Sequence, residues 1–321
     1  MMLLSRAHYA LRSPLVTAHG AINNREALLV GAQDGAVIGW AEYSPLPGFG
    51  MRMDLDRVAA EISAGLITPT VEWAQADLAA RTSGRWLAEL FGASTVNPSI
   101  PVNATIGDLS AQETGQRCRQ IAAEGYTAVK LKVAAGDVER DIGRVEAART
   151  ALGPTIELRL DANQGWNLGQ AHLALSRLGQ FGVAFVEEPT ADTDDMAELS
   201  AHGVGLALDE SLTSGSALEL VAGSPASVVV LKPAVVGGPA AALELVGLAE
   251  AAGKRVVVTS FFDGPIGLST ACRLAATLDA HGPHGVGTAG QVDAAYPPEL
   301  IAKDGKVTLP DAPGIGIEVA I

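Results

Sequence analysis

Five short apolar runs in this sequence each end in an ionisable residue, in the order Lys, Asp, Glu, Asp, Lys. Charge at the end of a strand-like run costs free energy unless it faces a polar site or a metal ion. The terminal residues are Lys132, Asp161, Glu187, Asp209 and Lys232, which follow one another at intervals of 22 to 29 residues. Such a series predicts strands of one barrel that deliver side chains to one active site.

Asp161, Glu187 and Asp209 predict a metal site, because they would converge from three consecutive strands. They come without a cluster of histidine or cysteine, so a hard, oxygen-loving ion is expected, and Mg²⁺ is favoured over Zn²⁺. In the simpler interpretation, each carboxylate caps the following helix or pairs with a lysine. That interpretation fits a single residue better than three in series.

Three lysines accompany the carboxylates. Lys130 and Lys132 are two residues apart, so on a strand both side chains point to the same face. Lys232 ends the sixth expected strand and Lys132 the second, which places them on opposite sides of an eight-stranded ring. Buried beside another cation and a metal, a lysine has a lowered pKa and can act as a base. Structural ion pairing is the alternative for these lysines.

Strand-like and helix-like segments alternate along residues 98–289, and these segments must position the charged residues. Strands are expected at 102–106, 128–133, 156–161, 184–187, 206–209, 227–232 and 255–260, with a weaker eighth near 285–288. Alternation implies a parallel sheet, and seven or eight units close into a TIM-type (β/α) barrel. An open doubly wound sheet is the alternative, although no Gly-x-Gly-x-x-Gly turn follows the first strand.

Residues 1–97 differ from the rest and predict an α+β capping domain, which the tail 290–321 is expected to join. Segments 27–31 and 37–42 predict an antiparallel hairpin with its turn at Asp34-Gly35. A Pro/Gly-rich loop at 44–50 and helical patterns around 55–66 and 71–91 follow.

Composition narrows the class of partner. The 321 residues include 22 basic and 36 acidic residues, giving a net charge of −14, and aromatic residues make up only 4%. Nucleic acid and anionic membrane surfaces are therefore not expected as partners. No apolar stretch reaches membrane-spanning length without Lys, Pro or paired Gly, and Cys118 and Cys272 are expected to be buried free thiols. We expect a cytoplasmic protein.

The short sequences around the charged residues are specific: Lys130-Leu131-Lys132, Asp161-Ala162-Asn163, Glu187-Glu188-Pro189, Asp209-Glu210-Ser211 and Leu231-Lys232-Pro233. With the expected cap and barrel, they resemble the enolase superfamily in its muconate-lactonizing subgroup. Sites of that superfamily are known to use a Lys or His base with Mg²⁺ to stabilise an ene-diolate. Within the subgroup, residues 39–49 and 158–163 are most similar to the o-succinylbenzoate synthase family.

The resemblance implies a lyase of menaquinone biosynthesis that is a monomer or a small homo-oligomer. Its substrate would be a small dicarboxylate, 2-succinyl-6-hydroxy-2,4-cyclohexadiene-1-carboxylate, which loses water by syn elimination to give o-succinylbenzoate. The cofactor would be Mg²⁺, with Mn²⁺ as a substitute, held by Asp161, Glu187 and Asp209.

Roles for the lysines also follow from the resemblance. Lys132 would remove the proton next to the ring carboxylate and then assist loss of hydroxide from the same face. Lys130 would lower the pKa of Lys132 by charge repulsion, and Lys232 would stabilise the planar anion from the opposite face.

Four further residues are candidates for substrate contact. Ser260 and nearby backbone N–H groups would hold the succinyl carboxylate, although the run 259–264 departs from the Ser-rich run with a Glu that is frequent in the family. Phe49, in the loop that would close over the site, would exclude water. Asn163 and Arg159 complete the set, but Arg159 faces the interior, where an ion pair is favoured over substrate contact.

Other reactions use the same machinery. Two lysines on opposite faces of the substrate can also catalyse the reaction of an N-acylamino acid racemase. The same residues are compatible with a muconate-type cycloisomerase. Dipeptide epimerases usually carry Asp-x-Asp at the eighth strand, where this chain has no acid at 285–289, and dehydratases similar to mandelate racemase use a histidine that 256–260 lacks. A catalytically silent barrel would have lost a ligand or a lysine. A Schiff-base lyase at Lys232 would leave three converging carboxylates unexplained.

Overall fold

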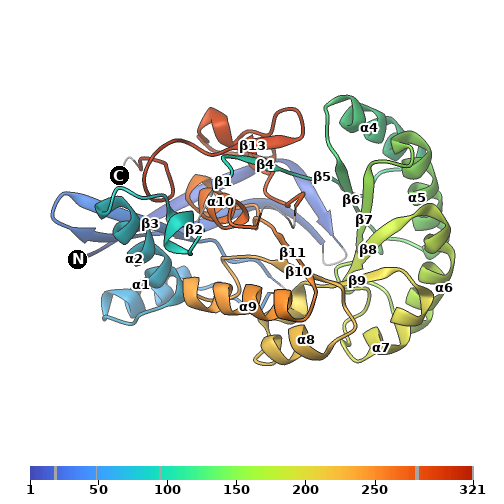
Figure 1. Cartoon of the computed structure of the whole chain (residues 1–321), viewed down its shortest axis with the longest axis horizontal. Helices are drawn as coiled ribbons and strands as arrows, with labels where there is room; N and C mark the ends of the chain where they lie inside the picture. Colours follow the sequence, from blue (N-terminus) through green and yellow to red (C-terminus); the bar gives the residue numbers. More distant parts are fainter. Residues whose placement is uncertain (18–19, 48, 94–95, 279–281, 320–321) are drawn as a thin grey trace.

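The computed structural model describes residues 1–17, 20–47, 49–93, 96–278 and 282–319. A curled parallel sheet with helices on its outside forms one part of the molecule, and an antiparallel sheet of N-terminal strands lies against it (Figure 1). The fold is therefore a TIM-type α/β arrangement with an N-terminal capping domain, as predicted.

Seven parallel strands make up the curled sheet, and their order in space follows their order in the chain. They are β5 (Ala104–Ile106), β6 (Ala128–Lys132), β7 (Glu157–Asp161), β8 (Val183–Glu187), β9 (Gly205–Leu208), β10 (Val228–Leu231) and β11 (Arg255–Val258). Each matches one of the seven strands expected from the alternation of the sequence. Because neighbouring strands are parallel, their carboxyl ends meet at one rim of the sheet.

The expected eighth strand near 285–288 is not formed. In its place, two single bridges join Val102 to His284 and Thr259 to Gly285. Pro283 lacks a donor and glycines weaken a strand, so this segment pairs at two residues only. The bridges still connect the two edges of the sheet, which excludes the open doubly wound alternative.

Helices cover the outside of the ring. They are α4 (Ala111–Ala123), α5 (Val138–Leu152), α6 (Leu168–Leu178), α7 (Asp195–Leu199), α8 (Ala217–Gly223), α9 (Pro239–Ala251) and α10 (Pro265–Ala275). Short 3₁₀ turns occur at η1 (Gly179–Phe181), η2 (Ser200–His202), η3 (Glu210–Thr213), η5 (Ala289–Gln291) and η6 (Pro298–Leu300). Side chains define several helix starts, for example Ser110, which forms a capping box with Glu113. Within the described ranges, no helix is long and apolar enough to cross a membrane.

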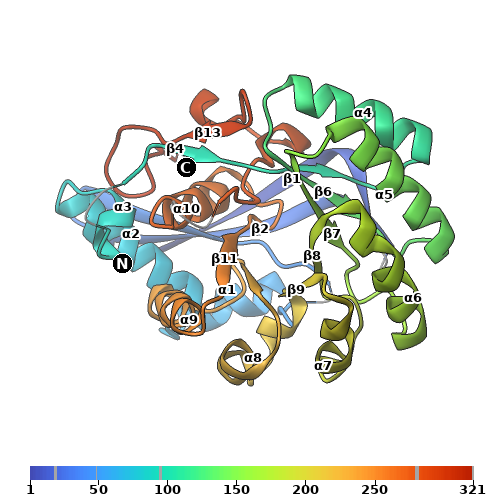
Figure 2. The same cartoon turned by 45° about the vertical axis from the view of Figure 1, so that its right-hand side comes forward.

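The N-terminal sheet has the order β12-β1-β2-β3, and all its strands are antiparallel. The strands are β1 (Met2–Thr17), β2 (Gly20–Asp34), β3 (Val37–Tyr43) and β12 (Val292–Asp293), accompanied by helices α1 (Leu55–Ser63), α2 (Pro69–Thr82) and α3 (Leu87–Leu90). The predicted turn at Asp34-Gly35 is confirmed, with Gly35 at a φ of 57°. The part of the β1–β2 hairpin farthest from the chain start reaches across toward the β6–β8 side of the ring (Figure 2).

The C-terminal segment returns to the N-terminal elements. β12 pairs with β1, and β13 (Lys306–Thr308) pairs with β4 (Ser99–Pro101). Asp77 of α2 is fully buried and accepts hydrogen bonds from the backbone N–H of Ile315 (2.6 Å) and of Trp40 (2.7 Å). One buried carboxylate thus joins the tail to α2 and β3.

Alternation along the strands separates the core from the interior of the ring. In β6, Val129 and Leu131 are fully buried in the hydrophobic core, whereas Lys130 and Lys132 keep partial exposure. The period of two residues therefore turns both lysines to one face, as predicted. Cys118 and Cys272 are buried free thiols, which confirms that prediction.

Candidate active site

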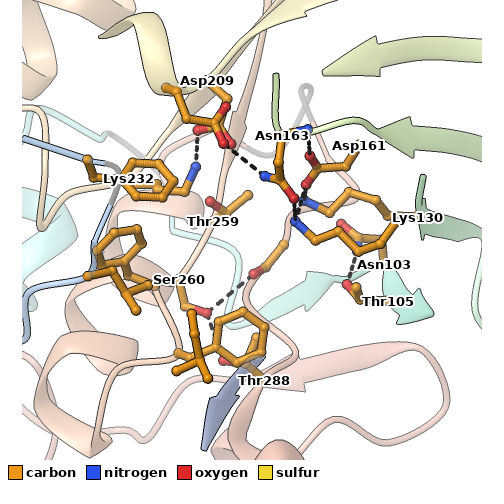
Figure 3. Close-up of a pocket in the computed structure, with 18 of the residues that line it drawn as sticks. Asn103, Thr105, Lys130, Asp161, Asn163, Asp209, Lys232, Thr259, Ser260 and Thr288 are labelled. Carbon is orange, nitrogen blue, oxygen red and sulfur yellow. Dashed lines mark hydrogen bonds and ion pairs between the residues drawn. The ribbon is translucent and has the colours of Figure 1, made fainter. Parts of the chain in front are cut away.

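One cavity of about 210 Å³ lies at the carboxyl rim of the ring, a volume somewhat below the usual range of about 300–1,000 Å³ for ligand sites. Residues of the ring and of the cap both line it. Figure 3 shows Lys232 and Asp209 on one side of this cavity and Lys130 and Asp161 on the other. Its position agrees with the general location of active sites in parallel barrels.

Asp161, Glu187 and Asp209 are buried, and each offers a carboxylate oxygen within 4.8 Å of the other two. Neighbouring oxygens on one Mg²⁺ ion lie about 3 Å apart, because each ligand distance is about 2.1 Å. These three residues would therefore hold the ion once their side chains draw closer together. The donor set, three hard oxygen ligands with no nitrogen or sulfur, fits Mg²⁺.

Lys130 and Lys132 face this cluster from β6. The Nζ atom of Lys130 lies 3.0 Å from Asp161 Oδ2 and 2.9 Å from Glu187 Oε2, and Lys132 Nζ lies 2.5 Å from Asp161 Oδ2. Burial would lower the pKa of Lys130, but the charges of Asp161 and Glu187 outweigh burial and hold it above its ordinary value. Burial likewise opposes ionisation of Asp161, yet the two lysines keep the pKa of that carboxyl well below its usual range.

Lys232 approaches the carboxylates from the other side. Its Nζ atom contacts Asp209 and lies 4.9 Å from the ring centroid of Phe49. Burial, followed by the charge of Lys130, lowers the pKa of Lys232 to about 7. The cavity thus has lysines on two walls, and Asp161 and Asp209 line it between them.

The sequence analysis did not identify Glu210. The side chain of Asn163 accepts a hydrogen bond from Lys132 Nζ (2.7 Å) and donates one to Glu210 Oε1 (2.8 Å). Asn163 itself adopts a left-handed backbone with a φ of 44°, which an asparagine tolerates better than most residues. Burial, followed by the charge of Asp161, raises the pKa of Glu210 to about 7. Glu210 follows Asp209 directly, so its place beside a predicted metal ligand was the available signal.

The chain of contacts from Lys132 through Asn163 to Glu210 predicts a positioning role for Glu210. We expect Glu210→Ala to lower kcat about 10-fold or more with little change in KM, because Asn163 loses its anchor and Lys132 its fixed geometry. Glu210→Gln keeps an acceptor and should restore most of the rate. Steady-state kinetics of both variants test this, and equal activity of the alanine variant and the unmodified enzyme would refute it.

Two further pairs of polar side chains line the cavity. Ser260 Oγ is 2.7 Å from Thr288 Oγ1, and Asn103 Nδ2 is 3.4 Å from Thr105 Oγ1. All four residues line the cavity, and the role of Ser260 in substrate contact stays a prediction.

Arg159 is not brought into the cavity. It is almost fully buried, its Nε atom lies 2.6 Å from Glu157 Oε1, and its Nη1 donates to Asn103 Oδ1 at 3.3 Å. Two residues before Asp161 on the same strand, Arg159 points into the ring below the rim. It lies in an internal ion pair and reaches the cavity only through Asn103.

Phe49 lines the cavity together with Leu46 and Pro47 of the loop that follows β3. Gly48 of that loop lies outside the described residues. The ring of Phe49 packs edge-on against Phe261, with centroids 4.7 Å apart, and Phe261 belongs to the loop after β11. The cap loop and the β11 loop therefore meet over the cavity.

Arg25 of β2 joins these two loops. It is buried and donates to the carbonyls of Ser44 (2.5 Å), Pro45 (2.6 Å) and Phe262 (3.4 Å), while its guanidinium lies over the ring of Phe261. The sequence analysis missed Arg25, because a single arginine in a strand ordinarily faces solvent.

Removing the side chain of Arg25 is expected to weaken the contact between the loop after β3 and the loop after β11, which meet over the cavity. Arg25→Ala should raise KM about 10-fold, with a smaller fall in kcat, because substrate loses its apolar cover while the lysines stay in place. Kinetics at matched fold content, checked by circular dichroism, provide the test. A variant that is merely less stable, with an unchanged KM, would show that Arg25 has only a structural role.

Comparison with known proteins supports a single family. Residues 113–320 match the enolase C-terminal domain-like family. An o-succinylbenzoate synthase of Thermobifida fusca is 35% identical over 273 residues, which cover 84% of this chain and 76% of that protein. A chloromuconate cycloisomerase of Cupriavidus necator is 31% identical over 76% of this chain and 67% of its own length.

Solved structures agree in fold. A muconate lactonizing enzyme from Pseudomonas fluorescens, solved with muconolactone, superposes with a TM-score of 0.87 at 23% identity, covering 100% of this chain and 96% of that one. The family match spans more than half of the chain, and it includes the three carboxylates and the lysines that face them. The resemblance found in the sequence is thereby confirmed: the chain belongs to the enolase C-terminal domain-like family of the enolase superfamily.

Proposed function

We propose that this protein is a lyase, an o-succinylbenzoate synthase. It would dehydrate 2-succinyl-6-hydroxy-2,4-cyclohexadiene-1-carboxylate in menaquinone biosynthesis, in the cytoplasm. The observation that carries the proposal is the placement of Lys132 and Lys232 on two walls of one cavity, which Asp161 and Asp209 of the three-carboxylate cluster also line. The 35% identity to the Thermobifida fusca synthase supports this choice within the superfamily.

The reaction divides among named atoms. Lys132 Nζ, positioned by Asn163 at 2.7 Å, takes the proton next to the ring carboxylate. The same ammonium then gives that proton to the departing hydroxyl on the same face, so that water leaves and the ring becomes aromatic. A Mg²⁺ ion at Asp161, Glu187 and Asp209 would supply positive charge to the substrate carboxylate as it gains electron density.

The remaining walls bind and orient the substrate. Lys232, on the opposite face, would stabilise the planar anion as a cation. Ser260, which is hydrogen-bonded to Thr288, would bind the second carboxylate of the substrate. Phe49 and Phe261 would exclude water from above, which strengthens every charge interaction inside the cavity.

A cycloisomerase is the second candidate, because the Cupriavidus necator relative is 31% identical over 251 residues. An N-acylamino acid racemase uses the same pair of lysines and is a third. A dipeptide epimerase is disfavoured, since residues 285–289 contain no acid to bind a peptide ammonium.

Loss of the substrate's diene absorbance in the presence of Mg²⁺ tests the proposal. Rapid turnover to o-succinylbenzoate is expected. A well-folded, Mg²⁺-binding protein without turnover would overturn the substrate. Chloromuconate, followed by ring closure, and N-acylamino acids, followed by exchange of the α-proton with deuterated solvent, would then distinguish the two alternatives.

A further inference from the structure

Two histidines and a glutamate form a chain of contacts on the outside of the ring. His172 lies in α6, Glu198 in α7 and His202 in the following turn, η2. His172 Nδ1 is 2.8 Å from His202 Nε2, and His172 Nε2 is 2.9 Å from Glu198 Oε1. Helices α6 and α7 lie side by side at the periphery, away from the ring centre (Figures 1 and 2). The cluster is therefore separate from the cavity described above.

The contact with Glu198 determines which nitrogen of His172 carries the proton and which has a lone pair. A carboxylate accepts hydrogen bonds, so the Nε2 atom that faces it carries the proton. In the neutral ring, His172 Nδ1 then presents a lone pair to His202. The His202 Nε2–H group donates to that lone pair, and its other nitrogen is bare.

The distance between the two histidine nitrogens is close to the distance expected in a metal site. Two imidazole nitrogens on a tetrahedral Zn²⁺ ion are about 3.3 Å apart, because each Zn–N bond is about 2.0–2.1 Å. The nitrogens of His172 and His202 need to separate by about 0.5 Å from their present 2.8 Å. The ring centroids are 5.1 Å apart and the ring planes meet at 63°.

The carboxylate supplies the second feature of such sites. A histidine that binds a metal usually donates its other N–H group to a carboxylate, which fixes the ring and raises its basicity. Glu198 already holds His172 in this way. The site is also accessible, since the side chains of His172 and Glu198 are 32% and 66% exposed.

We propose that His172 and His202 bind a borderline divalent cation of the zinc class, with Glu198 as the carboxylate that orients His172. On binding, the proton on His202 Nε2 moves to its Nδ1, so both ligand nitrogens are bare and no net proton is released. Nitrogen ligands favour Zn²⁺ over Mg²⁺, which separates this site from the triad. The ion would fasten α6 to η2.

Water must complete the coordination. Across the described residues, Asp161, Glu187 and Asp209 form the single group of three or more ionisable ligands within metal-binding distance. The histidine site therefore has two protein ligands and open positions, which gives it moderate affinity and rapid exchange.

Isothermal titration of the full chain with Zn²⁺, in excess Mg²⁺ to fill the triad, tests the proposal. The unmodified protein should bind one more Zn²⁺ equivalent than His202→Ala or His172→Ala, and Glu198→Gln should bind it about 10-fold more weakly. His8→Ala is the matched control. His8 pairs with Glu26 at 3.7 Å but has no second imidazole among its described contacts.

Zn²⁺ isotherms that agree within twofold among all variants would overturn the site, as would equal losses in His8→Ala and His202→Ala. If His202→Ala loses helical circular dichroism, His202→Gln replaces it. The imidazole proton resonances of the unmodified protein give a second measurement. Zn²⁺ should shift those of His172 and His202 and leave those of His8 in place, and unmoved resonances would mean that the cluster is only a chain of hydrogen bonds.

Discussion

Replacing Lys132 with alanine is expected to reduce kcat by roughly 10³- to 10⁴-fold, at the upper end of what a positioned general base contributes. Lys132 is held by Asp161 and Asn163 on one wall of the cavity, and we assign it both the proton removal and the proton return. Without its amine, neither step has a partner. The rate of diene loss at saturating substrate and Mg²⁺ measures the effect.

The control must separate catalysis from folding. Lys306→Ala removes a lysine from an exposed position on β13 and should leave the rate unchanged. The Lys132 variant should unfold at nearly the same temperature as the unmodified enzyme, because Lys130 still pairs with Asp161. Residual activity within 10-fold of the unmodified enzyme would show that Lys132 is not the base.

Removal of divalent metal is expected to silence the enzyme completely and reversibly. Asp161, Glu187 and Asp209 bring three negative charges to one buried position, and we expect these carboxylates to bind the ion that activates the substrate. Dialysis against EDTA should abolish turnover, Mg²⁺ should restore it, and Mn²⁺ should also support it. The recovered rate as a function of added metal is the measurement.

The fold should survive removal of the metal, so the experiment separates loss of catalysis from loss of structure. Lys130 pairs with Asp161 and Glu187, and Lys232 with Asp209, so cations of the protein itself balance the carboxylates. Circular dichroism should therefore stay unchanged while activity disappears. Glu187→Gln should require more Mg²⁺ for half-maximal rate. Full activity in metal-free buffer would contradict the three-carboxylate site.

Much of the ring could be predicted because each parallel strand combines two local signals. A strand such as Val228–Leu231 is a continuous run of apolar, mostly β-branched residues, and a charge follows it directly. The carboxyl ends of parallel strands share one rim, so residues placed there by sequence alone were expected to meet. The structure brings Lys132, Asp161 and Lys232 to one cavity accordingly.

The parts that escaped prediction depend on contacts between distant segments. β1 has no clean alternation, and its register shifts between Ala10 and Leu15, so local pattern did not reveal a strand. Glu210 gains its place through Asn163, 47 residues earlier in the chain. Arg25 bonds the carbonyl of Phe262, 237 residues away. No window of sequence contains both partners of such contacts.

The buried contacts of β2 and β3 with the β11 loop have a consequence for protein engineering. Glu42 accepts hydrogen bonds from the backbone N–H groups of Gly264 (2.6 Å) and Gly267 (3.0 Å), at the start of α10. Arg25 donates a hydrogen bond to the carbonyl of Phe262 in the same loop. A chimera that grafts a relative's cap onto this barrel must therefore carry the matching turn before α10 with it. The cap and the loop between β11 and α10 therefore form one structural unit. A chimera that exchanges the cap alone would lose the contacts between the cap and this loop.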